Sequence, residues 1–232
     1  MTGILNKSLV LALVSVFFTI PWFHYLLFPA PEKALLPMIP NPGSVLVAEL
    51  FLLFVICFLS SMIGFTFSKR AGLPGFGTAE NWIRSLPLLV FPGFAMIVFS
   101  WLLFDRHFIL VSPISYPDHP LYLLSFPLKG AFTDEIIMRF GLLTICVGIL
   151  RRKIAGVAAV SVFASLLTLK YFRFIGISPG LNYLFVMQML LSFVSNFMLG
   201  YVYVTRGLLQ SMTLKLIFGA KYVLIMLFRG CV

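Results

Sequence analysis

Apolar residues dominate this chain in long runs that polar residues interrupt only briefly. Most of the runs approach or exceed the ~20 residues that a helix needs to cross a bilayer. They cover residues 8–28, 45–67, 86–104, 121–150, 154–169, 182–204 and 207–228. Strands of a transmembrane barrel would alternate in polarity over about ten positions, and no run alternates in that way. The pattern predicts an all-α, polytopic transmembrane helix bundle of about seven to eight helices.

The fourth run is too long for one simple span. Residues 121–150 contain Pro127 and Gly130, and a proline inside a helix removes a hydrogen bond and clashes with the preceding turn. We therefore expect the chain to break there and a helix to follow from about Thr133 to Leu150.

Composition excludes the soluble classes of protein. Hydrophobic residues make up 61% of the chain and charged residues 10%, whereas an ordinary soluble domain carries about 25% charged residues. The net charge of +10 is spread over short loops, which favours topology signals and contacts with the lipid bilayer over nucleic-acid binding. No metal or cofactor is expected, because the three cysteines lie far apart without zinc-ligand spacing. These cysteines are Cys57, Cys146 and Cys231.

The basic residues favour one side of the predicted bundle. The side that holds the N-terminus carries Lys7, Lys69, Arg70, Arg84, Arg151, Arg152, Lys153 and Arg206, and the other side carries Lys33, Arg106, Lys170, Arg173 and Arg229. The positive-inside rule then places the N-terminus in the cytoplasm. No small-residue cleavage site follows the first run, which is predicted to be a retained span. We expect one membrane-embedded domain over residues 1–232, in the plasma membrane.

One stretch places charges where lipid makes them costly. Asp134, Glu135 and Arg139 lie inside the fourth run, and such residues usually face a bundle interior or a wet cavity. Glu135 and Arg139 are four residues apart and share one helix face, while Asp134 points about 100° away. A carboxylate held in this way can activate water. The alternative is a buried ion pair that only locks helix packing.

The sixth run carries a weakly polar stripe at four-residue spacing. Its members are Gln188, Ser192, Asn196 and Gly200. Small and polar residues promote close packing between helices in membranes. Helix packing is therefore the simpler interpretation, and the lining of a substrate cavity is the alternative.

The stretch from Asp134 to Arg139 resembles the Glu-Glu-x-x-x-Arg motif of the CAAX-processing and bacteriocin-processing intramembrane proteases, the CPBP or ABI family. Three further stretches are similar to that family. Residues 68–73 resemble its loop after the second span, residues 166–170 fall at its Phe-x-x-x-His segment, and residues 200–212 resemble its Gly-Tyr-hydrophobic-Tyr…Gly-Leu run. The resemblance covers roughly residues 50–228.

The resemblance implies a metal-independent intramembrane endopeptidase in which the second acid of the motif activates water. Carried over, Glu135 is the general base, Asp134 its partner and Arg139 the structural anchor. The two histidine positions of the family fall on Lys170 and Lys215, and the acid or amide position that follows falls on Gly219. The histidines of this chain all precede the motif; they are His24, His107 and His119.

The depths of the two lysines can be compared through the helical rise. Glu135 and Lys170 lie about 24 and 25 Å from the basic loop at 151–153, and Lys215 lies about 14 Å from Arg206. Lys170 is therefore the better expected partner of the acids, unless it snorkels to the end of its span. Lys215 lies deeper within its run, which favours a role in a cavity.

Three functions are compatible with these observations. The first is an endopeptidase, impaired or not by its missing histidines, that cleaves a membrane-associated peptide or protein. The second is a non-catalytic scaffold or pseudoprotease that binds such a peptide or partner. The third is a small transporter, which internal symmetry and a polar path through both halves would support. The first three runs carry little charge, which makes the transporter the weakest of the three.

Overall fold

The structure is a computed structural model, and it describes residues 2–27, 41–111, 116, 119–174 and 183–229. Within these ranges the side chains of residues 26, 169–174 and 228–229 are left out of the description.

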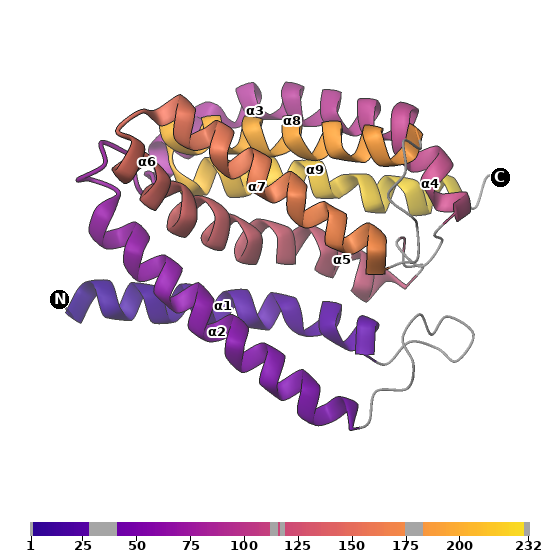
Figure 1. The fold of residues 1–232 in the computed structure, drawn as a ribbon, viewed down its shortest axis with the longest axis horizontal. Coiled ribbons are helices and arrows are strands. Elements are labelled where there is room, and N and C mark those ends of the chain that lie inside the picture. Colours follow the sequence, from indigo (N-terminus) through magenta and orange to yellow (C-terminus); the bar gives the residue numbers. More distant parts are fainter. Residues whose placement is uncertain (1, 28–40, 112–115, 117–118, 175–182, 230–232) are drawn as a thin grey trace.

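Seven helical rods make up the described part of the chain, and no strand occurs there (Figure 1). The first two rods are α1 (Thr2–Leu27) and α2 (Pro42–Phe67). The third joins α3 (Ala79–Ser100), the π-helical η2 (Trp101–Asp105) and α4 (Arg106–Val111). The fourth joins α5 (Pro120–Lys129), η4 (Gly130–Asp134), η5 (Ile136–Leu143) and α6 (Thr144–Leu150). The last three are α7 (Lys153–Phe174), α8 (Tyr183–Arg206) and α9 (Leu208–Arg229). The predicted all-α bundle is confirmed for these residues.

The fourth rod runs on without a break at Pro127 and Gly130, so the predicted interruption is wrong. Proline has no N–H to donate and crowds the carbonyl four residues earlier. The helix accommodates the proline in α5, and a π-helical turn follows from Gly130 to Asp134. The wider π turn shifts the hydrogen-bond register by one residue, and the rod continues to Leu150. Prolines also lie inside the first and third rods.

Local sequence sets where the rods begin and turn. Pro42 and Pro120 stand in the first turns of their helices, where the missing N–H costs nothing. The Thr78 side chain accepts a hydrogen bond from the Asn81 amide at the start of α3, a usual N-cap. Gly207 has a φ of +111° between α8 and α9, a conformation that strongly favours glycine.

The fourth rod is the centre of the bundle. It packs against α1 and α2 on one side and against α7, α8 and α9 on the other. Its Ile136, Phe140 and Leu143 are fully buried, and they form the middle of the main apolar core with Tyr203 of α8 and Leu208 of α9.

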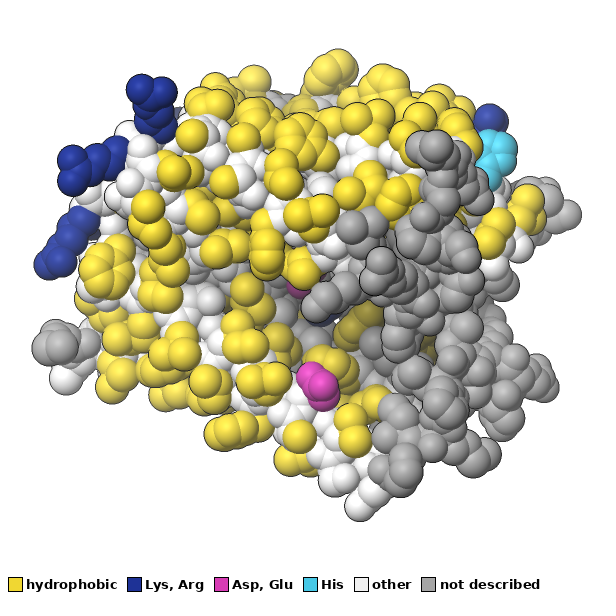
Figure 2. All heavy atoms as spheres, viewed as in Figure 1, with side chains coloured by type: hydrophobic (Ala, Val, Ile, Leu, Met, Phe, Trp, Pro, Cys, Tyr) yellow, Lys and Arg dark blue, Asp and Glu magenta, His cyan; other side chains and the backbone are white. Residues whose placement is uncertain are grey.

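The outer surface is apolar. Phe91, Leu110 and Ile149 are 81%, 81% and 74% exposed, and hydrophobic side chains cover most of the described part of the face in Figure 2, with basic side chains gathered near one end. Among the residues that the structure describes, five helices are long and apolar enough to cross a membrane: Thr2–Tyr25, Pro42–Phe67, Ala79–Val111, Tyr183–Arg206 and Leu208–Leu227. A shorter apolar helix covers Lys153–Thr168. The fourth rod differs from these because it carries Lys129, Asp134, Glu135 and Arg139.

The contact between α2 and the fourth rod has no room for side chains at two glycines. A Cβ atom on Gly64 would lie inside the Phe140 ring, and one on Gly141 would lie 2.7 Å from the Ser60 hydroxyl oxygen. Close approach of this kind is typical of small residues between packed helices.

We expect Gly64→Ala to lower the melting temperature of the detergent-solubilised protein, because the new methyl group must displace the Phe140 ring. Overpacking of this kind costs about 1–3 kcal/mol. Gly148→Ala is the matched control, since a Cβ there meets nothing within 4 Å and gains the same helix propensity. Equal melting temperatures for the two variants would refute the close packing of α2 on the fourth rod.

Candidate functional site

The charged residues of the fourth rod lie on and around its π-helical segments. Lys129 ends α5, Asp134 ends η4, and Glu135 separates η4 from η5, which carries Arg139. A π turn changes which side chains share a face. Asp134 and Glu135 enter different surroundings because adjacent side chains of a helix point about 100° apart.

Glu135 and Arg139 form the predicted ion pair, and both are completely buried. Their side chains are 1% and 0% exposed, and Arg139 Nε lies 3.7 Å from Glu135 Oε2. The same carboxylate oxygen accepts a hydrogen bond from the Ser211 hydroxyl of α9. Arg139 therefore supplies the counter-charge of Glu135, and Ser211 supplies a hydrogen-bond donor.

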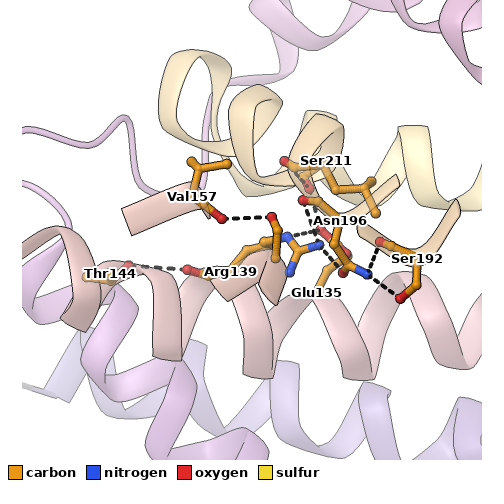
Figure 3. A network of polar contacts seen from close by, with 9 residues as sticks. Glu135, Arg139, Thr144, Val157, Ser192, Asn196 and Ser211 are labelled. Atoms are coloured by element: carbon orange, nitrogen blue, oxygen red, sulfur yellow. Dashed lines mark hydrogen bonds and ion pairs between the residues drawn. The ribbon is translucent and has the colours of Figure 1, made fainter. Parts of the chain in front are cut away.

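Asn196 of α8 completes the surroundings of Arg139. Arg139 Nη2 donates to Asn196 Oδ1 at 2.7 Å and to the Asn196 carbonyl at 3.3 Å, while Asn196 Nδ2 donates to the Ser192 carbonyl at 2.8 Å. Figure 3 shows Arg139 lying between Glu135 and Asn196, with Ser211 reaching the site from α9. Arg139 Nε and Nη1 have no hydrogen-bond partner among the described residues. This network ties η5, α8 and α9 together.

A cavity of about 330 Å³ lies beside this network. Helices η2, α5, η4, α8 and α9 contribute most of its wall. Its charged lining residues are Asp105, Lys129, Asp134, Lys215 and Lys221, and its neutral polar side chains include Gln188, Ser192, Ser195 and Asn196. Asp134 lines the cavity, whereas Glu135 and Arg139 do not.

Asp134 is paired and partly open to the cavity. Lys129 Nζ donates to Asp134 Oδ1 at 3.0 Å, and the two side chains are 27% and 39% exposed in the order Lys129, Asp134. Because Glu135 is 1% exposed, Asp134 is the acid of the motif that a molecule in the cavity can reach.

Lys215 shares the cavity with Asp134. A Cβ atom on Gly130 would lie 3.0 Å from Lys215 Cε and 3.8 Å from Asp134 Oδ2, so both side chains flank this glycine. Lys215 has no ion pair or hydrogen bond with any residue that the structure describes. The structure thus brings Lys215 next to the motif; the Lys170 side chain lies outside the described residues.

The cavity also holds an ion pair that the sequence analysis missed. Lys221 Nζ lies 3.0 Å from Asp105 Oδ1 and 3.0 Å from the Ser100 hydroxyl, and the Tyr116 hydroxyl donates to Asp105 Oδ1 at 2.5 Å. Asp105 is 1% exposed. A lone aspartate at the end of the third apolar run was the only sign of it in the sequence, and nothing there indicated Lys221 as its partner.

The weakly polar stripe of α8 serves both predicted purposes. Gln188, Ser192 and Asn196 line the cavity, whereas a Cβ on Gly200 would lie 3.0 Å from the Val157 side chain of α7. The first three residues belong to the site, and the glycine allows α7 and α8 to pack closely.

None of the three histidines lines the cavity. His24 Nδ1 lies 3.0 Å from the Tyr122 hydroxyl, and the His119 ring accepts a hydrogen bond from the Leu121 amide. Within the described residues, no three His, Cys, Asp or Glu side chains lie close enough together to hold a metal ion.

Comparison with protein-family models, curated proteins and solved structures finds no match. The resemblance to the CPBP proteases therefore depends on the motif at residues 134–139 and on the three further stretches of sequence that are similar to that family.

We expect Glu135→Gln to destabilise the fold strongly, because it leaves the buried Arg139 guanidinium without a counter-charge. Removing one partner of a buried ion pair costs about 3–5 kcal/mol. The double variant Glu135→Leu/Arg139→Met, which removes both charges, should recover most of this loss in a thermal-unfolding assay. Asp134→Asn is the matched control and should cost about 1 kcal/mol or less, as partly exposed pairs do. If Glu135→Gln unfolds at the wild-type temperature, the pair does not anchor the bundle.

Proposed function

We propose that this chain is an integral membrane protein of the plasma membrane that crosses the bilayer with its seven rods and has a cytoplasmic N-terminus. Its exposed side chains are largely apolar, while Glu135, Arg139 and Asp105 are buried inside. Lipid imposes this distribution, since a charge facing the hydrocarbon is costly. The basic loop at 151–153 and the turn at Arg206 lie at the end of the bundle where α1 begins.

We further propose that the cavity is the active site of a metal-independent intramembrane endopeptidase that cleaves a membrane-associated peptide or protein. The observation that carries this proposal is that Asp134 and Lys215 both lie close to Gly130 in the wall of a polar cavity. An acid that accepts protons and a cation that stabilises negative charge are the two groups that hydrolysis of an amide requires.

The geometry supports a division of roles that differs from the one implied by the family motif. Asp134 accepts a proton from a water molecule as the water oxygen attacks the carbonyl carbon of the peptide bond. Lys215 donates a hydrogen bond to the oxyanion that forms. Asp134 then returns the proton to the leaving nitrogen as the C–N bond breaks, which balances the reaction without a metal. Lys129 donates to the other oxygen of this carboxylate, Oδ1.

Glu135 and Arg139 act as the structural anchor in this proposal. Their contacts with Ser211 and Asn196 hold α8 and α9 against the fourth rod. Lys215 on α9 is thereby held in the same cavity as Asp134. Glu135 positions the site and does not touch the substrate.

A specific observation favours a second function, a non-catalytic scaffold that binds a membrane peptide. Lys129 already occupies one oxygen of Asp134, and lysines stand at the two positions where the CPBP family has histidines. A lysine shuttles protons less readily than a histidine near neutral pH. In this alternative the same cavity holds the peptide without cleaving it.

We expect Asp134→Asn to reduce cleavage about a hundredfold or more, as loss of a general base does. The assay uses proteoliposomes that contain a pool of lipid-anchored peptides and detects the products by mass spectrometry. Lys215→Met should also slow cleavage, through a lower turnover number.

Thermal unfolding shows whether reduced cleavage by Asp134→Asn results only from a loss of fold. We expect this variant to unfold near the wild-type temperature. If the wild-type protein cleaves nothing but a photo-crosslinker at Gln188 captures an anchored peptide, the scaffold is the function. If the wild type and Asp134→Asn cleave equally, the proposed role of Asp134 is wrong.

The proposed topology predicts opposite locations for the two ends of the chain. A fluorescent protein that folds only in the cytoplasm should fluoresce when fused to the N-terminus and stay dark when fused to the C-terminus. A phosphatase that is active only after export should give the reverse result. Release of the protein from membranes by alkaline carbonate would contradict membrane insertion itself.

A further inference from the structure

A second concavity lies at the basic end of the bundle, away from the cavity with Asp134. It is a groove of about 800 Å³ between the end of α2 and the turn from α6 to α7. The apolar part of its lining includes Phe67, Ile145 and Ile149, and its cations are Arg70, Arg151 and Lys153. No residue lines both the groove and the cavity, so the groove is a separate feature.

The three cations of the groove have no acidic neighbours. No Asp or Glu lines the groove, and none of the three forms an ion pair with a residue that the structure describes. Arg70 lies over the Phe67 ring, 5.8 Å from its centroid. Three clustered positive charges without counter-charges form a site for an anion, and the fork of a guanidinium suits a phosphate group.

Arg151 is held in a backbone conformation that its residue type disfavours. Its φ is +53°, at the position that ends α6, where glycine is the usual residue. Arginine accepts a strained conformation here, and such strain is concentrated at functional positions. The strain is consistent with a use for the charge of Arg151 in the groove.

The apolar part of the groove is open to the outside. Ile149, Phe67 and Ile145 are 74%, 47% and 41% exposed. A free phosphate would leave this apolar surface uncovered, whereas a lipid can cover it with an acyl chain. The groove therefore matches a ligand with an anionic head and an apolar tail.

We propose that this groove binds an anionic phospholipid. The phosphate diester lies among Arg70, Arg151 and Lys153, and an acyl chain lies along Phe67, Ile145 and Ile149. Basic recesses between membrane helices on the cytoplasmic side commonly hold anionic headgroups in this way. This inference rests on the proposed membrane insertion and is independent of the proposed proteolysis.

The test is native mass spectrometry of the full chain in detergent micelles, titrated with phosphatidylglycerol or phosphatidylcholine. The variant Arg70→Gln/Arg151→Gln/Lys153→Gln should lose about tenfold or more in affinity for phosphatidylglycerol, since each basic residue near an anionic headgroup contributes appreciably. The matched control is Lys7→Gln/Lys69→Gln/Arg152→Gln. It removes the same number of charges from exposed residues outside the groove and should bind as the wild type does.

Gly148→Trp tests the apolar half of the site. Gly148 lines the groove, and a Cβ atom there meets nothing within 4 Å, so the indole is expected to enter the groove. Thermal unfolding near the wild-type temperature checks that the fold is kept. It should weaken phosphatidylglycerol binding although all charges remain. Water-soluble glycerol phosphate should not compete.

Equal loss of phosphatidylglycerol binding in the groove variant and in its control would overturn the proposal, because the lipid would then be attracted by the total positive charge of the protein and not by the groove. Competition by glycerol phosphate at the same concentration as lipid would show a plain phosphate site and overturn it as well. Native mass spectrometry measures lipid binding without any peptide cleavage, and carbonate extraction measures membrane insertion separately. Failure of this inference is thus distinguishable from failure of either proposed function.

Discussion

The bundle depends on one constraint, which is that the charge of Arg139 must be neutralised without help from bulk water. Arg139 is fully buried, and an isolated charge in such surroundings costs several kcal/mol or more. Glu135 supplies the counter-charge, and Asn196 supplies acceptors from another helix. Replacing a buried pair by apolar residues is often neutral for stability. We infer that the pair specifies which faces of η5, α8 and α9 meet.

This anchor explains why the adjacent acids have different roles. Glu135 contacts Arg139 and Ser211 through Oε2, and with 1% of it exposed the surrounding protein covers this acid. Asp134, one residue earlier and at the end of the π turn, reaches the cavity. Two consecutive positions thus hold a structural acid and an accessible one, because adjacent side chains of a helix point about 100° apart.

Much of the fold could be predicted because lipid-length apolar runs leave few alternatives. All seven runs correspond to rods in the described structure, and the ion pair between Glu135 and Arg139 follows from their four-residue spacing. The break at Pro127 was predicted wrongly, because helix propensity is a weak guide where tertiary packing holds a helix together, and Pro21, Pro87 and Pro92 also lie inside helices. The contacts of Asn196 with Arg139, of Ser211 with Glu135 and of Asp105 with Lys221 could not be predicted. Each joins residues that are distant in sequence and that only the packing of the helices brings together. The helical rise favoured Lys170 as the partner of the acids, and its side chain lies outside the described residues. Lys215, for which a cavity role was expected, lies close to Gly130 and Asp134.

The length of the fourth rod has a consequence for the tilt of the bundle. It runs unbroken from Pro120 to Leu150 and measures about 45 Å at the rise of an α-helix, while the hydrocarbon core of a bilayer is about 30 Å thick. In the proposed membrane, a rod of this length tilts or extends past the hydrocarbon at one or both ends. Because α1, α2, α7, α8 and α9 pack around it, its tilt sets the angle at which the helices beside it would cross the bilayer.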